Sequence, residues 1–284
     1  MRFRTEIEPV AASLDISHET PLLLLGSCFS DEIGTRLDTD GFHTVHNPLG
    51  PLFNPCSITR CLRLAKGSEE PFVEVGPRGF HALDFASRYS GSDKAAILED
   101  ISAGLGRISD ILSARPVAIL TLGSAFVYRH NASRRIVGNC HKFPASAFTR
   151  ERLGTEEICR QLRDAIGILL DSGCRHVLLT ISPIRHLDDG LHGNTLSKAA
   201  LHLGAEETLR HFGSDTAGYF PSYEILMDDL RDYRFYASDM KHPSETAADY
   251  IYEIFSKTYF SKATQATALE SRRQNKTALH RPIL

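Results

Sequence analysis

Two short stretches of the sequence carry side chains that could act together in catalysis. The first is Gly26-Ser27-Cys28, which directly follows the apolar run of residues 22–25. A buried strand that ends at Gly26 and turns into a helix would leave the Ser27 hydroxyl at the carboxyl end of a sheet, where open α/β folds bind ligands. The first N–H groups of the helix would stabilise negative charge at the same place. The stretch predicts a nucleophile beside an oxyanion site, although a Ser27 that only caps the helix is the commoner arrangement on local sequence alone.

The second stretch is Asp239-Met240-Lys241-His242-Pro243, which precedes the last predicted helix of the core. An aspartate three residues before a histidine, in a turn interrupted by proline, can place both side chains on one side. The carboxylate can then accept the Nδ1 proton and direct Nε2 toward a nucleophile. Taken alone, such a pair is more often a helix-capping acid beside a surface histidine.

Cys28 is a second potential nucleophile, directly beside Ser27. A thiolate at a helix N-terminus can be reactive, but a small buried apolar side chain is the more common role of cysteine. The six cysteines include no Cys-x-x-Cys pair, and the N-terminus lacks the apolar core of a signal peptide. We therefore expect free thiols and a cytoplasmic location.

Alternating strand and helix patterns position these residues. Apolar runs typical of buried strands occupy residues 21–25, 41–45, 117–123 and 176–181, and two small β-hairpins are predicted at 72–83 and 126–137. Helical patterns lie at 31–37, 57–64, 92–115, 155–172, 195–211, 224–232 and 246–260. Strands that are apolar throughout are typical of sheets covered on both faces. We therefore expect an α/β fold of three α/β/α layers with a mostly parallel sheet and small hairpin insertions.

Composition and charge limit the possible partners. The net charge of −3 and the pI near 6.5 give no reason to expect a nucleic acid or an anionic membrane as partner. No stretch approaches the ~20 apolar residues of a transmembrane helix. We predict a single domain over residues 1–260, with its core at about 20–260, and a flexible C-terminal tail over 261–284. The sequence does not indicate an oligomeric state.

In combination, the motifs are specific. Gly-Ser after the first strand and Asp-x-x-His before the last core helix resemble the SGNH (GDSL-like) hydrolases, whose sheet is flavodoxin-like. The resemblance narrows to the GSCFA family, because Gly26-Ser27-Cys28-Phe29 matches its name-giving motif, with Ser30 where the name has alanine. Further motifs follow in order: Asn47-Pro48-Leu49-Gly50, Thr121-Leu122-Gly123-Ser124, Asn139-Cys140-His141-Lys142, Ser182-Pro183, Tyr219 to Glu224, and Asp239 with His242-Pro243.

The resemblance implies a serine esterase that forms an acyl-enzyme. Ser27 would be the nucleophile, His242 its general base and Asp239 the group that orients the imidazole. The substrate would be a small-molecule or carbohydrate ester, with an O-acetyl group as one candidate, and no cofactor is expected. No metal is expected either, since the histidine pairs 43/46 and 186/192 lack a third ligand. The same triad could serve an O-acyltransferase, and a ligand-binding relic without turnover is a third hypothesis.

One departure from the wider superfamily concerns the oxyanion donor. SGNH hydrolases usually carry Gly-x-Asn after the third strand, whereas this chain has Gly123-Ser124-Ala125. Loss of one donor typically costs ~3 kcal/mol of transition-state stabilisation, so a competent enzyme needs a replacement. We predict that Asn139 supplies it, with Asn47 as the second candidate and the N–H groups of Ser27 and Gly50 beside it. Gly123 is counted with the oxyanion or substrate-binding residues. An Asn139 that only bonds loop backbone is an alternative of nearly equal weight.

Overall fold

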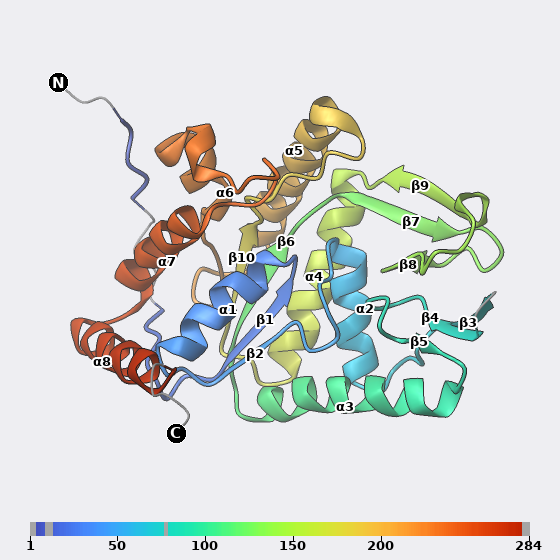
Figure 1. Ribbon diagram of the computed structural model, residues 1–284, viewed down its shortest axis with the longest axis horizontal. Coiled ribbons are helices and arrows are strands. Elements are labelled where there is room, and N and C mark those ends of the chain that lie inside the picture. Colours follow the sequence, from blue (N-terminus) through green and yellow to red (C-terminus); the bar gives the residue numbers. More distant parts are fainter. Residues whose placement is uncertain (1–3, 9–13, 77–78, 280–284) are drawn as a thin grey trace.

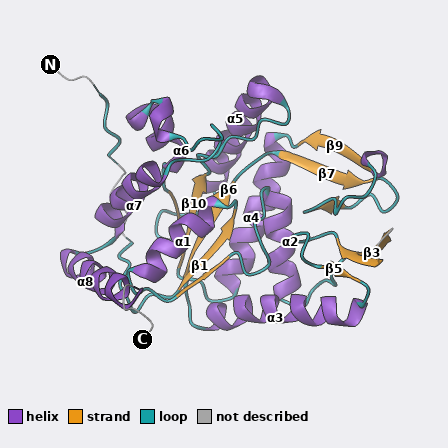
Figure 2. Ribbon diagram, viewed as in Figure 1, coloured by secondary structure: helices purple, strands orange, loops and turns teal. Residues whose placement is uncertain are grey.

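Five apolar segments pair in parallel at the centre of the structure (Figures 1 and 2). The computed structural model describes residues 4–8, 14–76 and 79–279. The strands are β1 (Leu22–Gly26), β2 (Thr44–His46), β6 (Val117–Leu122), β10 (His176–Ile181) and β11 (Ala217–Tyr219), in the spatial order β11-β10-β6-β1-β2. Counted along the chain, this is the order 2-1-3-4-5 of flavodoxin-like sheets, whose ligands bind where the order reverses, between the first and third strands. That point lies between β1 and β6.

Helices cover both faces of this sheet. Figure 1 shows α1 (Phe29–Thr39), α7 (Glu245–Tyr259) and α8 (Lys262–Leu279) to the left of the sheet, and α2 (Pro55–Ala65), α3 (Lys94–Ser113) and α4 (Thr155–Asp171) to the right. The helix α5 (Gly190–Leu209) joins the core of the second group. Successive side chains of a strand point to opposite faces of the sheet. Leu22 and Leu24 therefore pack in the core on the side of α1 and α7, and Leu23 and Leu25 pack in the core on the side of α2, α3 and α4. The predicted three-layer α/β fold is confirmed.

Two small antiparallel sheets interrupt this plan, both to the right in Figure 1. Their strands are β3 (Val73–Gly76), β4 (Gly79–Ala82) and β5 (Ser90–Gly91), and then β7 (Phe126–His130), β8 (Ile136–Val137) and β9 (Phe148–Arg152). Both predicted hairpins exist, and each has gained a third strand that the sequence pattern did not reveal. Pro77 and Arg78, in the turn of the first hairpin, lie outside the described residues.

The chain between β11 and α7 forms short helical turns. They are α6 (Ser222–Glu224), a π-helical turn (Ile225–Leu230) and a 3₁₀ turn (Tyr233–Phe235), and a further 3₁₀ turn (Ala145–Ala147) precedes β9. The continuous helix predicted over 224–232 is therefore divided between two kinds of turn. Nowhere in the described chain is a helix both long and apolar enough to cross a membrane.

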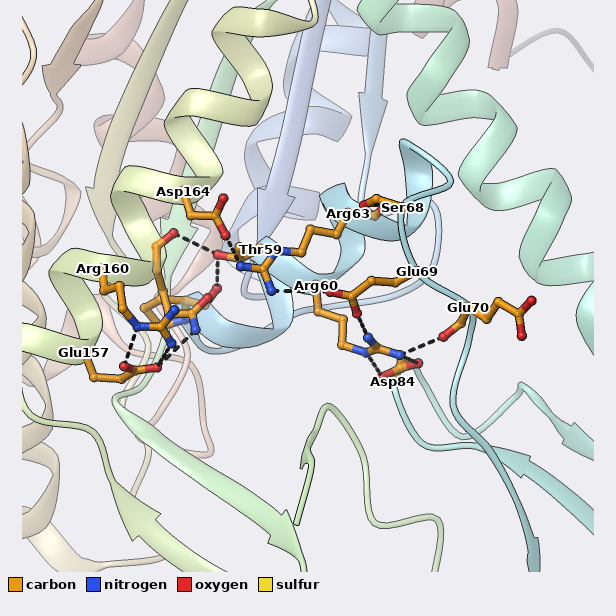
Figure 3. A network of polar contacts seen from close by, with 12 residues as sticks. Thr59, Arg60, Arg63, Ser68, Glu69, Glu70, Asp84, Glu157, Arg160 and Asp164 are labelled. Atoms are coloured by element: carbon orange, nitrogen blue, oxygen red, sulfur yellow. Dashed lines mark hydrogen bonds and ion pairs between the residues drawn. The ribbon is translucent and has the colours of Figure 1, made fainter. Parts of the chain in front are cut away.

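Two arginines of α2 fix this helix against its surroundings (Figure 3). Arg60 donates to the buried carboxylate of Asp84, with Nε 2.6 Å from Oδ1, and also binds Glu69. Arg63 pairs with Asp164 of α4. Because the Asp84 side chain is buried, losing its partner would leave a desolvated charge. These contacts fix the middle and the last turn of α2.

The segment after residue 260 differs from the predicted flexible tail. Residues 262–279 form α8, which buries Ala268 and pairs Arg272 with Asp40 at the end of α1, with Nε 2.7 Å from Oδ1. The sequence shows no apolar stripe here, because polar contacts and small buried side chains, rather than a row of large apolar residues, anchor the helix. Residues 280–284 lie outside the described chain.

Candidate functional site

The turn after β1 brings the chain very close to β6. Gly26 has a φ of +141°, and a Cβ at this position would lie 2.1 Å from the carbonyl oxygen of Thr121. Only glycine fits such an approach. The N–H of Ser27 then donates to the same oxygen at 3.0 Å, which extends the β-pairing by one residue beyond the strand. Cys28 follows and begins α1.

With the strand extended in this way, the side chain of Ser27 is buried and that of Cys28 is partly exposed. Ser27 has no exposed surface, and its Oγ accepts the N–H of Phe29 at 3.3 Å. Cys28 is half-buried, and its Sγ lies 3.7 Å from Nε2 of His242. No hydrogen bond joins Ser27 and His242, both of which are described. The imidazole of His242 thus lies against the Cys28 thiol, and the role of Ser27 as nucleophile stays a prediction.

Asp239 and His242 lie on a tight turn, with Met240 in the left-handed region at a φ of 57°. Asp239 Oδ2 lies 2.6 Å from Nδ1 of His242, and its Oδ1 accepts the N–H groups of Lys241 and His242 at 2.9 and 3.0 Å. These donors, the backbone N–H of His242 foremost, hold the pKa of Asp239 far below its usual range. A charged carboxylate at Nδ1 keeps the proton there and leaves the Nε2 lone pair for the thiol.

The Cys28 thiol rests in its protonated form. Partial burial raises its pKa, and the charges of Asp31 and Glu32 in the first turn of α1 add to this effect, while the charge of Lys198 opposes it. A thiol in this state becomes a strong nucleophile only when a base takes its proton. The imidazole of His242 is placed to do so.

Asn47 holds the turn from the side of β2. Its Oδ1 accepts the N–H of Gly26 at 2.9 Å, and its Nδ2 donates to the carbonyl of Ser27 at 3.2 Å and to Asp31 at 2.9 Å. All of these groups are buried or partly buried. The carboxamide is therefore fully engaged in positioning Cys28 and is not a free oxyanion donor.

We expect Asn47→Ala to lower the free energy of unfolding by about 1–3 kcal/mol, because the N–H of Gly26 would be left buried without an acceptor. Denaturant unfolding followed by circular dichroism measures this change. Asn139→Ala is the matched control, since its carboxamide bonds only to loop groups. If the two variants lose equal amounts of unfolding free energy, Asn47 has no special role in holding the turn.

The other predicted oxyanion groups are engaged elsewhere. The N–H of Gly50 donates to the carbonyl of Asn47 at 2.8 Å, and that of Gly123 donates to the carbonyl of Phe53 at 2.9 Å. Asn139 accepts the N–H of His141 at 2.8 Å, which is the loop-bonding alternative. The N–H of Cys28, in contrast, has no acceptor in any other residue of the described chain.

Two groups beside the turn were not predicted to belong to the site: His186, weighed from the sequence only as a metal ligand, and Lys198. A Cβ on Gly123 would lie 3.2 Å from both Ser27 Cβ and His186 Nε2, so His186 borders the same space. Its Nε2 is buried without a hydrogen-bond partner among the described residues. Burial, together with the charges of Lys198 and His242, lowers the pKa of His186 to about 4, and it stays neutral near pH 7. Lys198 donates to the carbonyl of Gly123 at 2.7 Å. Neither residue carries a local sequence signal, because α5 and the loop after β10 reach the site only through the fold.

The described residues contain no group of three or more His, Cys, Asp or Glu side chains that could hold a metal ion. At the turn, a thiol, an imidazole and a carboxylate lie in a row. This arrangement suits transfer of an acyl group through the sulfur.

The GSCFA family model matches residues 21–255 of this chain. None of the curated proteins matches it. A similar solved structure is a candidate SGNH hydrolase from Slackia heliotrinireducens, with 10% identity and a TM-score of 0.43 over 84% of this chain and 98% of the other. Another is a carbohydrate esterase of family 3 from Talaromyces cellulolyticus, with 11% identity and a TM-score of 0.38 over 87% and 98%. Both are too distant to carry an argument about activity.

Proposed function

The chain belongs to the GSCFA family, and we propose that it is an acyl-ester hydrolase whose nucleophile is the thiol of Cys28. The observation that carries the proposal is the 3.7 Å contact between Cys28 Sγ and His242 Nε2, with Asp239 bound to the opposite ring nitrogen. Acyl transfer through a thiol requires a base that takes the thiol proton, and a carboxylate on the far ring nitrogen orients that base. The substrate class we propose is an O-acetyl or similar ester of a small molecule or carbohydrate.

In the first half of the reaction, Sγ attacks the ester carbonyl while Nε2 of His242 takes the thiol proton. The tetrahedral intermediate collapses as the imidazolium returns that proton to the leaving alkoxide, which departs as an alcohol. The product left on the protein is a thioester at Cys28. Asp239 stabilises the imidazolium and keeps the ring in the required tautomer.

In the second half, His242 takes a proton from water, which attacks the thioester carbonyl. Collapse of this second intermediate releases the carboxylic acid and regenerates the thiol. The N–H of Cys28 at the start of α1 is available as an oxyanion donor in both halves, and the dipole of α1 favours the same charge.

Two features of Ser27 support the choice of thiol over hydroxyl. Its side chain has no exposed surface for an ester to reach, and its Oγ is hydrogen-bonded to backbone. A serine mechanism at Ser27 would require the turn to move. An O-acyltransferase would use the Cys28 thioester with an alcohol in place of water.

The test is to trap the acyl-enzyme. The protein is mixed with p-nitrophenyl acetate, quenched in acid and digested, and the acetylated peptide is mapped by mass spectrometry. We expect acetyl on Cys28 in the wild type and none at this position in a folded His242→Gln variant.

Acetyl on Ser27 would establish the serine mechanism instead. A folded wild-type protein without adduct or turnover would point to the ligand-binding relic. Ester products formed after alcohols are added would identify the acyltransferase.

A further inference from the structure

A buried lysine lies at the carboxyl ends of the two central strands next to the site. Lys198, on α5, is 2% exposed, and its Nζ donates to the carbonyl oxygens of Gly123 after β6 and Ser182 after β10, both at 2.7 Å. In the described chain no carboxylate pairs with this ammonium. Taking an unpaired charge out of water is costly, so a buried lysine without a carboxylate partner has a lowered pKa, and a nearby anion would stabilise its charged form.

Four titratable groups face Lys198 from the surrounding elements. Lys198 binds the carbonyl of Gly123, and a Cβ on Gly123 would lie 3.2 Å from both His186 Nε2 and the Cβ of Ser27, the residue before Cys28. The charge of Lys198 therefore acts on Cys28 and His186, and also on His202 of its own helix, while the ring of Tyr223 on α6 lies 5.8 Å from Nζ. The pKa of both histidines is lowered and that of Tyr223 is raised, chiefly by burial, so none of these three is an anion near neutral pH. Among these four, only Cys28 can become one.

We infer that Lys198 is a positioning residue that ties the ends of β6 and β10 together and holds a positive charge near Cys28, where it stabilises the thiolate. The inference rests on the proposed role of Cys28 as nucleophile. The two hydrogen bonds need only two N–H donors, which a neutral amide could supply. A neutral amide in place of Lys198 would keep the two hydrogen bonds and lose only the positive charge.

The charge should be present only over part of the pH range. Burial lowers the pKa of Lys198 to about 7, and the nearby Cys28 raises it in part. Because the ammonium exists below this pKa, its support of the thiolate is present in mildly acidic solution and is lost as the pH rises. A merely structural tie would show no such dependence.

The experiment measures alkylation of Cys28 by iodoacetamide in the full chain, mapped by mass spectrometry, between about pH 6 and about pH 9. Lys198→Gln removes the charge and keeps an amide that can donate twice. At the lower pH we expect Cys28 of the Lys198→Gln variant to be alkylated about tenfold more slowly than Cys28 of the wild type. This factor is equivalent to one unit in the pKa of the thiol. At the higher pH the two alkylation rates should converge. Lys257→Gln, which removes an exposed lysine of α7, is the control and should match wild type throughout.

A rate ratio that does not change with pH, or no difference at all, would overturn the inference. A second measurement needs no change at Lys198. In a His242→Gln background, coupling between Lys198 and Cys28 predicts a rate that rises less than tenfold per pH unit through pH 7, whereas a curve for one uncoupled group would contradict it. Failure of the proposed nucleophile is distinguishable, because it would appear as wild-type labelling that is slow at Cys28 and independent of His242.

Discussion

Cys28→Ala is expected to lower kcat for a small acetyl ester by roughly 10⁴–10⁶-fold, the range seen when a nucleophile is removed from a triad. Ser27→Ala is expected to keep kcat within about tenfold of wild type. The difference follows from the turn after β1, where the Ser27 side chain is enclosed and the Cys28 thiol meets His242. Steady-state kinetics with p-nitrophenyl acetate measures both variants.

Folding must be checked in the same variants, because Ser27 Oγ accepts the N–H of Phe29 and its loss affects the start of α1. Thermal unfolding followed by circular dichroism provides this control. A Ser27→Ala protein that is folded and inactive, beside a Cys28→Ala protein that is active, would return the mechanism to the serine predicted from sequence.

Asp239→Asn is expected to lower kcat by up to roughly 10⁴-fold while the protein stays folded. An asparagine can donate its amide N–H to Nδ1, which places the imidazole proton on Nε2. The ring would then present a donor to Cys28 and could not take its proton. Asp239 is about half exposed, and the variant should therefore unfold at nearly the wild-type temperature.

The measurement combines kcat with the alkylation rate of Cys28, since both depend on proton transfer to His242. Asp228→Asn, at an exposed aspartate paired with Arg231, serves as the control and should change neither quantity. If Asp239→Asn loses less than about tenfold in kcat, thiol and imidazole suffice as a dyad and the carboxylate is dispensable.

The main features of the fold could be predicted from sequence because they depend on local patterns. The leucines of residues 22–25 are fully buried, as a strand covered on both faces requires, and the run at 117–122 behaves in the same way. The helix α8 could not be found in this manner. It is held by the buried Ala268 and by polar contacts with distant residues, such as the ion pair between Arg272 and Asp40 across 232 positions, which no periodicity reveals.

In the site, too, contacts between neighbours in sequence could be predicted, and contacts between distant residues could not. Asp239 and His242 are three residues apart, so their contact follows from the geometry of one turn. The choice between Ser27 and Cys28 depends on tertiary contacts of the turn, among them the hydrogen bond from the N–H of Ser27 to the carbonyl of Thr121 and those of Asn47. Lys198 meets Gly123 across 75 positions of sequence and could not be placed at all.

The pairing of Asp40 with Arg272 also bears on the order in which the parts of the chain can fold. Asp40 ends the helix that begins at Cys28, and in the folded protein it is 2% exposed, held by Arg272 and by the hydroxyl of Tyr252. Synthesis runs from the N-terminus, so this carboxylate leaves the ribosome long before either partner exists. Until α7 and α8 are made, it has to remain in water. The helix that presents the thiol therefore completes its packing late, when the last part of the described chain closes over it.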